Sequence, residues 1–267
     1  MTLVTHGLRA LQGILMRELL RFVHQRDRFV SALVRPLMWL FIFAAGFRST
    51  LGVAIIPPYD TYILYEVYIT PGLMGMVQLF NGMQSSLSMV YDREMGSMKT
   101  LLTSPLPRGF LLTAKLLAGV VVSILQVYVF LGIAWLAGIE APPEGYLWLL
   151  PALLLSGLML GALGLLLSSF VRQLENFAGV MNFVIFPMFF LSSALYPLWR
   201  IQESSPWLAR LSAWNPFTHA VETLRFALYG QFNAESALIT AATLVLCLWA
   251  AIRGYDPVKG NLSRRSG

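Results

Sequence analysis

Five long stretches without a charged side chain limit what this chain can fold into. Each runs for 17 to 27 residues, and the five cover residues 67–91, 116–139, 145–171, 176–199 and 236–252. About 20 mostly apolar residues are enough for an α-helix to cross the hydrocarbon core of a membrane. A sixth stretch, near residues 29–47, contains a single charged residue, Arg35, which can extend its guanidinium to the interface. The sequence therefore predicts an all-α, polytopic membrane protein with six transmembrane helices.

The composition excludes the common soluble classes. Of 267 residues, 57% are hydrophobic and 12% are charged, and the mean hydropathy is +0.67. A soluble domain carries roughly 25% charged residues, so this chain cannot cover the surface of a soluble enzyme. The single cysteine, Cys247, allows neither an intrachain disulfide nor a cysteine-based metal cluster. The net charge of +6 fits basic cytoplasmic loops better than a nucleic-acid partner.

The distribution of basic residues predicts the orientation. With six alternating helices, fifteen of the nineteen Lys and Arg fall on the side that holds both termini. Because cytoplasmic loops collect Lys and Arg, we expect both termini in the cytoplasm. This topology divides the chain into a cytoplasmic amphipathic helix (1–28), a six-helix transmembrane domain (29–252) and a basic cytoplasmic tail (253–267).

The first 28 residues have the pattern of a helix that lies on a membrane surface. Leu8, Leu11, Leu15, Leu19 and Phe22 recur at three- and four-residue spacing, and basic residues occupy the other faces. An amphipathic helix of this kind lies in the interface plane. Two roles stay open for it, an anchor on anionic lipid and a docking element for a partner.

A short cytoplasmic segment between the second and third predicted helices suggests a docking helix. It begins with charged residues, continues with Met98, Leu101 and Leu102, and closes with Pro105. A plain loop does not need an exposed leucine pair, whereas a helix that inserts into a partner's groove does. Proline after such a helix is a stop signal.

The stretch 196–235 on the outer side is rich in tryptophan and other aromatic residues. Trp and Tyr favour the membrane–water boundary. Asn215-Pro216 is typical of a helix start, with proline at the first helical position. We therefore expect a short helix over 216–229 that sits in, or dips into, the outer leaflet.

Uncharged polar side chains also occur within the predicted helices. Such groups can line a substrate pathway or form hydrogen bonds between helices, and the sequence leaves both readings open. The candidates for lining a pathway are Gln78, Asn81, Gln84 and Asn182.

The sequence lacks the motifs that would give the chain its own chemistry. It contains no G-x-x-x-x-G-K-[ST] phosphate loop, no H-E-x-x-H and no G-x-S-x-G. We therefore expect no catalysis and no bound cofactor. His219 and Glu222, three residues apart, are the one candidate acid–base pair for a membrane enzyme, and a boundary hydrogen bond or gate contact explains them more simply.

A stand-alone carrier or channel is a different interpretation of the same helices. It would need ionisable groups within the membrane or an internal inverted repeat, and the sequence offers neither. A membrane anchor for an ATPase partner, without transport, is also compatible with the sequence, although no large outer domain is present.

Over roughly residues 10–255 the chain resembles the permease subunit of type-2 ABC exporters, the class of drug, nodulation-factor and polysaccharide export permeases. One departure is Ser193-Ala194, where many relatives have a glycine. The resemblance rests on four motifs: Thr70-Pro71-Gly72; Asp92-Arg-Glu94-x-Gly96 with Leu101-Leu102-x-x-Pro105-Leu-x-Arg108 and Lys115; Phe186-Pro187-x-x-Phe190-Leu-Ser192-Ser-Ala-Leu-Tyr-Pro197; and Asn215-Pro216-Phe-Thr-x-Ala-Val-Glu222-x-x-Arg225.

The resemblance implies an export permease in the bacterial inner membrane, which forms the substrate pathway as a dimer. The two copies would be identical or related, and the sequence leaves that choice open, with a homodimer as the expectation. Two copies of a separate ATPase subunit would bind it in the cytoplasm and use ATP and Mg²⁺. The N-terminal helix would be the interface helix, 93–104 the coupling helix, and 216–229 an outer re-entrant helical hairpin that narrows the exit. The implied coupling residues are Asp92, Arg93, Glu94, Gly96, Met98, Leu101, Leu102 and Pro105, and the implied gate residues are Asn215, Pro216, His219, Glu222 and Arg225.

Overall fold

A computed structural model describes residues 3–24, 26–43, 46, 56–94, 107–171 and 174–254. Over these ranges the chain is helical and contains no β-strand. The elements are α1 (Leu3–His24), α2 (Arg26–Met38), the π-helical turn η1 (Trp39–Phe43), α4 (Tyr65–Glu94), α6 (Arg108–Leu136), α7 (Pro143–Phe170), α8 (Leu174–Phe190), α9 (Leu198–Ser204), α10 (Pro206–Trp214), α11 (Pro216–Leu228) and α12 (Ala234–Gly254).

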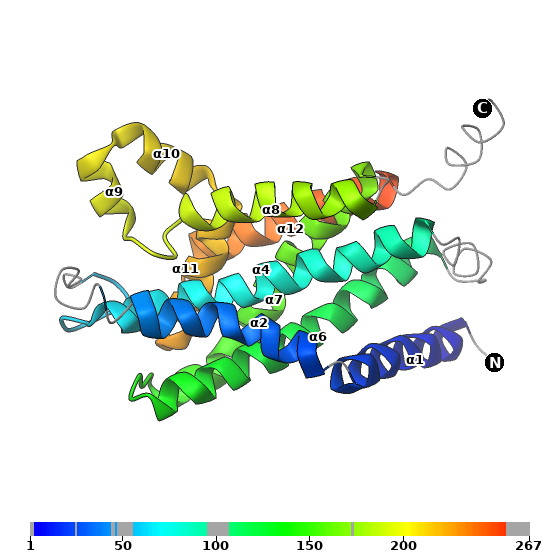
Figure 1. Cartoon of the computed structure of the whole chain (residues 1–267), viewed down its shortest axis with the longest axis horizontal. Helices are drawn as coiled ribbons and strands as arrows, with labels where there is room; N and C mark the ends of the chain where they lie inside the picture. Colours follow the sequence, from blue (N-terminus) through cyan, green and yellow to red (C-terminus); the bar gives the residue numbers. More distant parts are fainter. Residues whose placement is uncertain are drawn as a thin grey trace.

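The long helices form one bundle around α4 and α7 (Figure 1). Helix α7 packs against α4, α6, α11 and α12, while α2 and α8 pack against α4. Within the described residues, three helices are long and apolar enough to span a membrane: Gly109–Leu136, Pro143–Phe170 and Ala234–Gly254. Two shorter apolar helices, Ala32–Ile42 and Glu175–Phe190, accompany them. The chain is therefore a multi-helix membrane protein, and the number of six spans stays a prediction.

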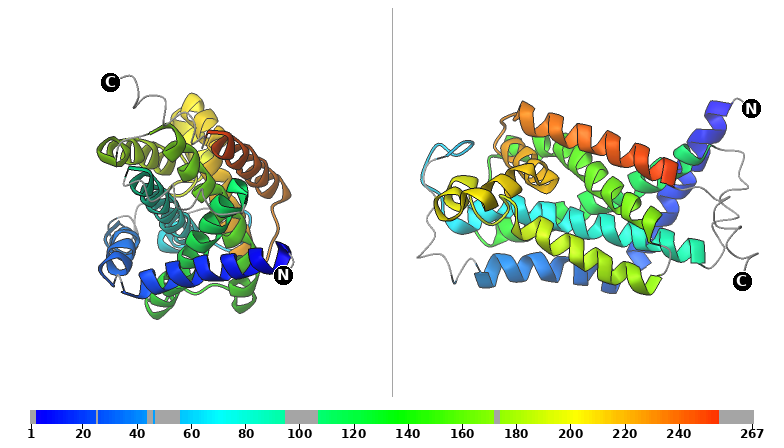
Figure 2. Two further views of the ribbon diagram at one scale, coloured as in Figure 1. Left: turned by 90° about the vertical axis from the view of Figure 1, so that its right-hand side faces the viewer. Right: turned by 90° about the horizontal axis from the view of Figure 1, so that it is seen from above.

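The two ends of the bundle differ in what they carry. The start of α6 and the ends of α4 and α12 lie at the end where α1 is placed, and α9 and α10 lie at the opposite end (Figure 1). Helix α1 lies across its end of the bundle, against α6 (Figure 2). Gly7 on α1 faces the ring of Phe110 on α6, so this contact joins the amphipathic helix to the start of a long helix.

Helix α8 ends earlier than the apolar stretch that predicts it. The stretch runs to residue 199, but the helix ends at Phe190 and a turn segment follows over 191–197. Ser192, Ser193, Ala194 and Leu195 in this segment are buried, because α4 lies directly beside it. The apolar run continues past the helix end since this turn, like a helix, belongs to the protein core.

Helix α11 lies inside the bundle. It packs against α4, α7 and α12, and its face with Phe217, Ala220, Val221 and Leu224 is buried. The sequence predicts a helix over 216–229, and the structure gives Pro216–Leu228. Protein, rather than a lipid leaflet, covers the apolar face of this helix.

Candidate functional site

Helix α11 carries a buried arginine that joins three parts of the bundle in the half opposite α1. Arg225 is 2% exposed, and its Nη1 lies 2.6 Å from Glu222 Oε1 on the same helix. Nη1 also donates to the Tyr68 hydroxyl of α4 at 3.0 Å, and Nη2 donates to the Ser193 carbonyl at 2.8 Å. The Tyr68 hydroxyl in turn donates to the same carbonyl at 2.9 Å. We call these four residues the Arg225 cluster.

Electrostatics explains why this arrangement needs all its members. A buried guanidinium is strongly disfavoured unless a counter-charge and hydrogen-bond acceptors replace its water. Glu222 supplies the charge from one helical turn away, the i,i+3 spacing at which helix side chains meet. Tyr68 adds its ring face, 4.0 Å from the guanidinium carbon. The cluster therefore holds α11 against α4 and the 191–197 turn.

The side chain of Asn215 caps the end of α8 and the start of α11. Its side-chain Nδ2 donates to the carbonyls of Met188 at 2.7 Å and Leu191 at 2.6 Å, at the end of α8. Its Oδ1 accepts from the backbone N–H of Phe217 at 3.0 Å, and Pro216 takes the first position of α11. Helix ends leave such carbonyls and N–H groups without intrahelical partners, so one amide satisfies both ends.

His219 and Glu222, the candidate acid–base pair, have different partners. The imidazole Nε2 lies 2.9 Å from the carbonyl of Ala213, while Glu222 pairs with Arg225. The five gate candidates of the sequence thus lie on one helix and its cap, but this pair forms no hydrogen bond among the described contacts. Through its contact with Ala213, His219 holds the start of α11 against the end of α10.

The four polar candidates separate into two that bond to a neighbouring helix and two that are exposed. Gln78 Nε2 donates to the carbonyl of Leu153 on α7 at 2.7 Å, and Ser156 Oγ donates to Gln78 Oε1 at 2.6 Å. Asn81 donates to Gln126 of α6 at 2.5 Å. These amides hold α4 to its neighbours. Gln84 on α4 and Asn182 on α8 are exposed instead.

Replacing Gln78 with leucine tests this separation. Gln78 is 1% exposed, so the change should lower the free energy of unfolding by about 1 kcal/mol, the range of hydrogen bonds between membrane helices. The matched change of exposed Gln84 to leucine should leave stability within about 0.5 kcal/mol. Thermal unfolding of both variants in detergent measures the difference. Equal losses would contradict a bridging role for Gln78.

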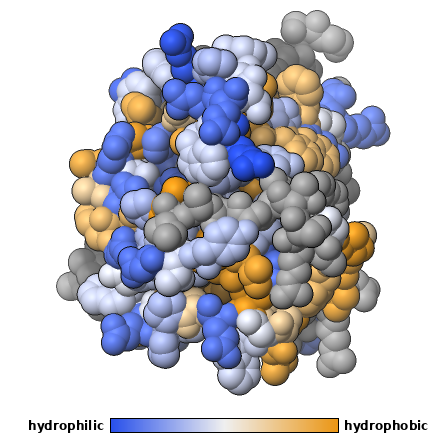
Figure 3. All heavy atoms as spheres, turned by 90° about the vertical axis from the view of Figure 1, so that its left-hand side faces the viewer, coloured by the Kyte–Doolittle hydropathy of each residue, from blue (hydrophilic) through white to orange (hydrophobic). Residues whose placement is uncertain are grey.

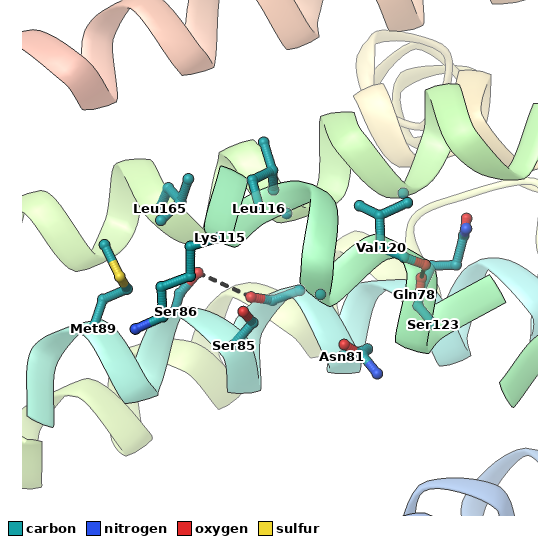
Figure 4. A pocket seen from close by; sticks show the side chains of 14 residues that line it. Gln78, Asn81, Ser85, Ser86, Met89, Lys115, Leu116, Val120, Ser123 and Leu165 are labelled. Atoms are coloured by element: carbon teal, nitrogen blue, oxygen red, sulfur yellow. Dashed lines mark hydrogen bonds between the residues drawn. The ribbon is translucent and has the colours of Figure 1, made fainter. Parts of the chain in front are cut away.

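A small cavity lies between α4, α6 and α7 (Figure 4). Its volume is about 10 Å³, room for about one water molecule. Lys115, which is 6% exposed, lines it together with Ser85, Ser86 and Ser123. Gly157 and Gly161 of α7 also face it and allow the close helix approach. The cavity is too small for an organic substrate.

Three of the predicted coupling residues lie at the α1 end of the bundle. Asp92, Arg93 and Glu94 form the last turn of α4. Helix α6 begins nearby at Arg108, and α1 packs against α6. The other coupling candidates fall outside the described residues: Gly96, Met98, Leu101, Leu102 and Pro105.

Sequence reasoning missed two members of the site. Tyr68 and Ser193 are 125 residues apart, and nothing in either neighbourhood indicates that they meet. A third residue, Gly72, carried a signal without an explanation, because it belongs to a motif. A Cβ on Gly72 would lie 2.7 Å from the Cα of Ala194, so only glycine fits here. Over the described residues, no group of three His, Cys, Asp or Glu could hold a metal ion.

Comparison with known proteins gives this geometry a context. The sequence model of the ABC-2 type transporter family matches residues 9–229. The putative transport permease ycf38 of Cyanophora paradoxa is 28% identical over 74% of this chain and 66% of its own length. The probable multidrug ABC transporter permease YbhR of Escherichia coli K12 is 30% identical over 60% of this chain and 43% of its own length.

A third relative with a different name is also similar to this chain. Nodulation protein J of Rhizobium leguminosarum bv. viciae is 27% identical over 43% of this chain and 44% of its own length. The family match spans well over half of the chain and includes α4, α11 and the segment between α8 and α9. The chain therefore belongs to the ABC-2 type transporter family, as a transmembrane subunit.

Proposed function

We propose that the chain is the permease subunit of an ATP-driven exporter in a bacterial inner membrane. Two identical copies would form the substrate pathway, and each would bind a separate ATPase subunit that uses ATP and Mg²⁺. The α1 end and both termini would face the cytoplasm, since that side of the predicted topology holds most Lys and Arg. The chain itself would supply no catalysis and bind no cofactor.

One observation carries this proposal. Helix α1, the last turn of α4 and the start of α6 all lie at the same end of the bundle (Figure 1). The connection between α4 and α6 contains the leucine pair, so it begins and returns at that end. An ATPase bound there would act directly on α4, which passes through the bundle to Tyr68 and the Arg225 cluster. A rigid helix with contacts at both ends can transmit a displacement.

The proposal is tested by assembly and ATPase rate. The chain is purified with its ATPase partner, and the mass and the ATPase rate of the complex are measured in lipid. We expect two copies of each subunit, with a rate different from that of the ATPase alone. A chain that binds no ATPase but moves solute by itself in vesicles would establish a stand-alone carrier instead.

Leu101→Asp is the sharper test of the coupling segment. A carboxylate in an apolar groove is strongly disfavoured, so the variant should lose most of its bound ATPase or its effect on the ATPase rate. Leu101→Met keeps the apolar volume and serves as the matched control. The readouts are ATPase retained on the purified chain and cellular efflux of ethidium, chosen because one relative is named a multidrug permease. Normal assembly and efflux with Leu101→Asp would contradict the coupling assignment.

A further inference from the structure

Helices α9 and α10 form an arm at the outer end that carries an unpaired aromatic stripe. The arm covers residues 198–214; α9 packs against α10, and α10 packs against α11 (Figure 1). On α10, Trp207, Leu211 and Trp214 are spaced at i, i+4 and i+7, so they share one face. Their exposed fractions are 63%, 48% and 88%. Two indoles and a leucine turned away from the protein need an explanation.

The depth of the arm is fixed by its connection to α8. Helix α8 has 17 residues and begins on the α1 side of the bundle. At 1.5 Å per residue it is about 26 Å long, close to the roughly 30 Å of the hydrocarbon core. Asn215 donates to carbonyls at the end of α8, so its neighbour Trp214 lies level with that end. The Trp214 end of the stripe therefore lies where the hydrocarbon core gives way to headgroups.

Other exposed indoles mark the same end of the bundle. Trp135 stands in the last turn of α6 and Trp148 near the start of α7, and both are more than half exposed. Figure 3, which views this end, shows hydrophilic side chains over much of the face and hydrophobic ones along parts of its rim. Rings of tryptophan at one level are the signature of a membrane–water interface.

The charges of the arm complement phospholipid headgroups. Arg210 follows Trp207 by three residues on α10, and Arg200 lies on α9; both are exposed. Arginine forms charge-assisted hydrogen bonds with phosphate oxygens and can extend from an apolar surface to reach them. A helix with indoles on one face and arginine beside them is suited to the interface plane.

We propose that the α9–α10 arm is an interfacial anchor, with Trp207, Leu211 and Trp214 inserted among outer-leaflet phospholipids and Arg210 bound to their phosphates. The partner is the bilayer itself rather than a protein. Because Asn215 joins the arm to α8 and α11, the anchor fixes the height of α11, and with it the Arg225 cluster, relative to the lipid surface.

Spin labels test where the stripe lies. In full-length protein with Cys247→Ser, nitroxides are attached at Leu211→Cys, at Glu203→Cys on α9 and at Leu246→Cys near the middle of α12. The protein is reconstituted into phosphatidylcholine–phosphatidylglycerol vesicles. The ratio of collisions with oxygen to collisions with a water-soluble nickel chelate should be highest at 246, intermediate at 211 and lowest at 203, with 211 several-fold above 203.

Two results would overturn the proposal. Equal ratios at 211 and 203 would place the arm in water. Spin–spin broadening at 211 would place the stripe against a second copy of the chain. Neither result depends on the ATPase, so they are separate from failure of the permease assignment.

Fluorescence quenching of Trp214 is a second test, and it changes only one residue of the stripe. The difference in emission between the unmodified protein and Trp214→Phe isolates Trp214. We expect brominated phosphatidylcholine to quench this difference strongly and aqueous iodide to quench it weakly. The reverse order would also overturn the proposal.

Discussion

Replacement of Arg225 by methionine should lower the free energy of unfolding by about 3 kcal/mol. Removing one partner of a buried ion pair typically costs 3–5 kcal/mol, because the other charge stays behind without compensation. Glu222 retains some contact with solvent, which places the expected loss at the lower end of that range. The change also removes the donors to Tyr68 and Ser193, so α11 loses its polar contacts with α4 and the 191–197 turn.

Thermal unfolding in detergent measures this loss. Arg200→Met on α9 is the matched control, because Arg200 is exposed and should be nearly neutral for unfolding. The double variant Arg225→Met/Glu222→Gln should recover part of the loss, since it leaves no unpaired carboxylate. An effect of Arg225→Met no larger than that of Arg200→Met would show that the cluster does not stabilise the fold.

Gly72→Ala should also be strongly destabilising, by about 2–3 kcal/mol. The added methyl would lie 2.7 Å from the Cα of Ala194 and 2.8 Å from its carbonyl carbon. These are backbone atoms, so no side-chain rotation can relieve the overlap, and overpacking of this kind costs about 1–3 kcal/mol. The turn after α8 would have to move away from α4, and Ser193 would move with it.

Gly132→Ala provides the control for this prediction. Gly132 lies on α6, is exposed, and has no atom within 4 Å of the position that a Cβ would take. Alanine is about 0.5–1 kcal/mol better than glycine within a helix, so this variant should be neutral or slightly more stable. Unfolding temperatures of the two variants, measured side by side, check both expectations. Similar behaviour would mean that the contact at Gly72 is loose.

Apolar patterning predicts most of the helices but not where each one ends. The charge-free stretch 145–171 and the helix Pro143–Phe170 nearly coincide, because the charged residues Glu144 and Arg172 bound the stretch. The stretch 176–199 exceeds its helix, since a buried turn is as apolar as a helix. The arm at 198–214 is not predicted because two short helices do not produce a long periodic signal.

The site is predictable only where partners are close in the sequence. Glu222 has potential i,i+3 partners on both sides, His219 and Arg225, and spacing alone does not choose between them. The structure selects Arg225, because burial of a guanidinium requires a counter-charge. Tyr68 and Ser193 complete the cluster from distant segments, and that choice follows from how the helices pack.

The double cap at Asn215 determines how the end of the protein opposite α1 can move. A hinge needs backbone that can change its dihedral angles freely. Here one side chain binds the carbonyl of Met188 in the last turn of α8, the carbonyl of Leu191 directly after α8, and the first N–H of α11. Bending at this junction would break three hydrogen bonds together. We therefore expect the end of α8, α10 and α11 to shift as one rigid body, without a change of angle at Asn215.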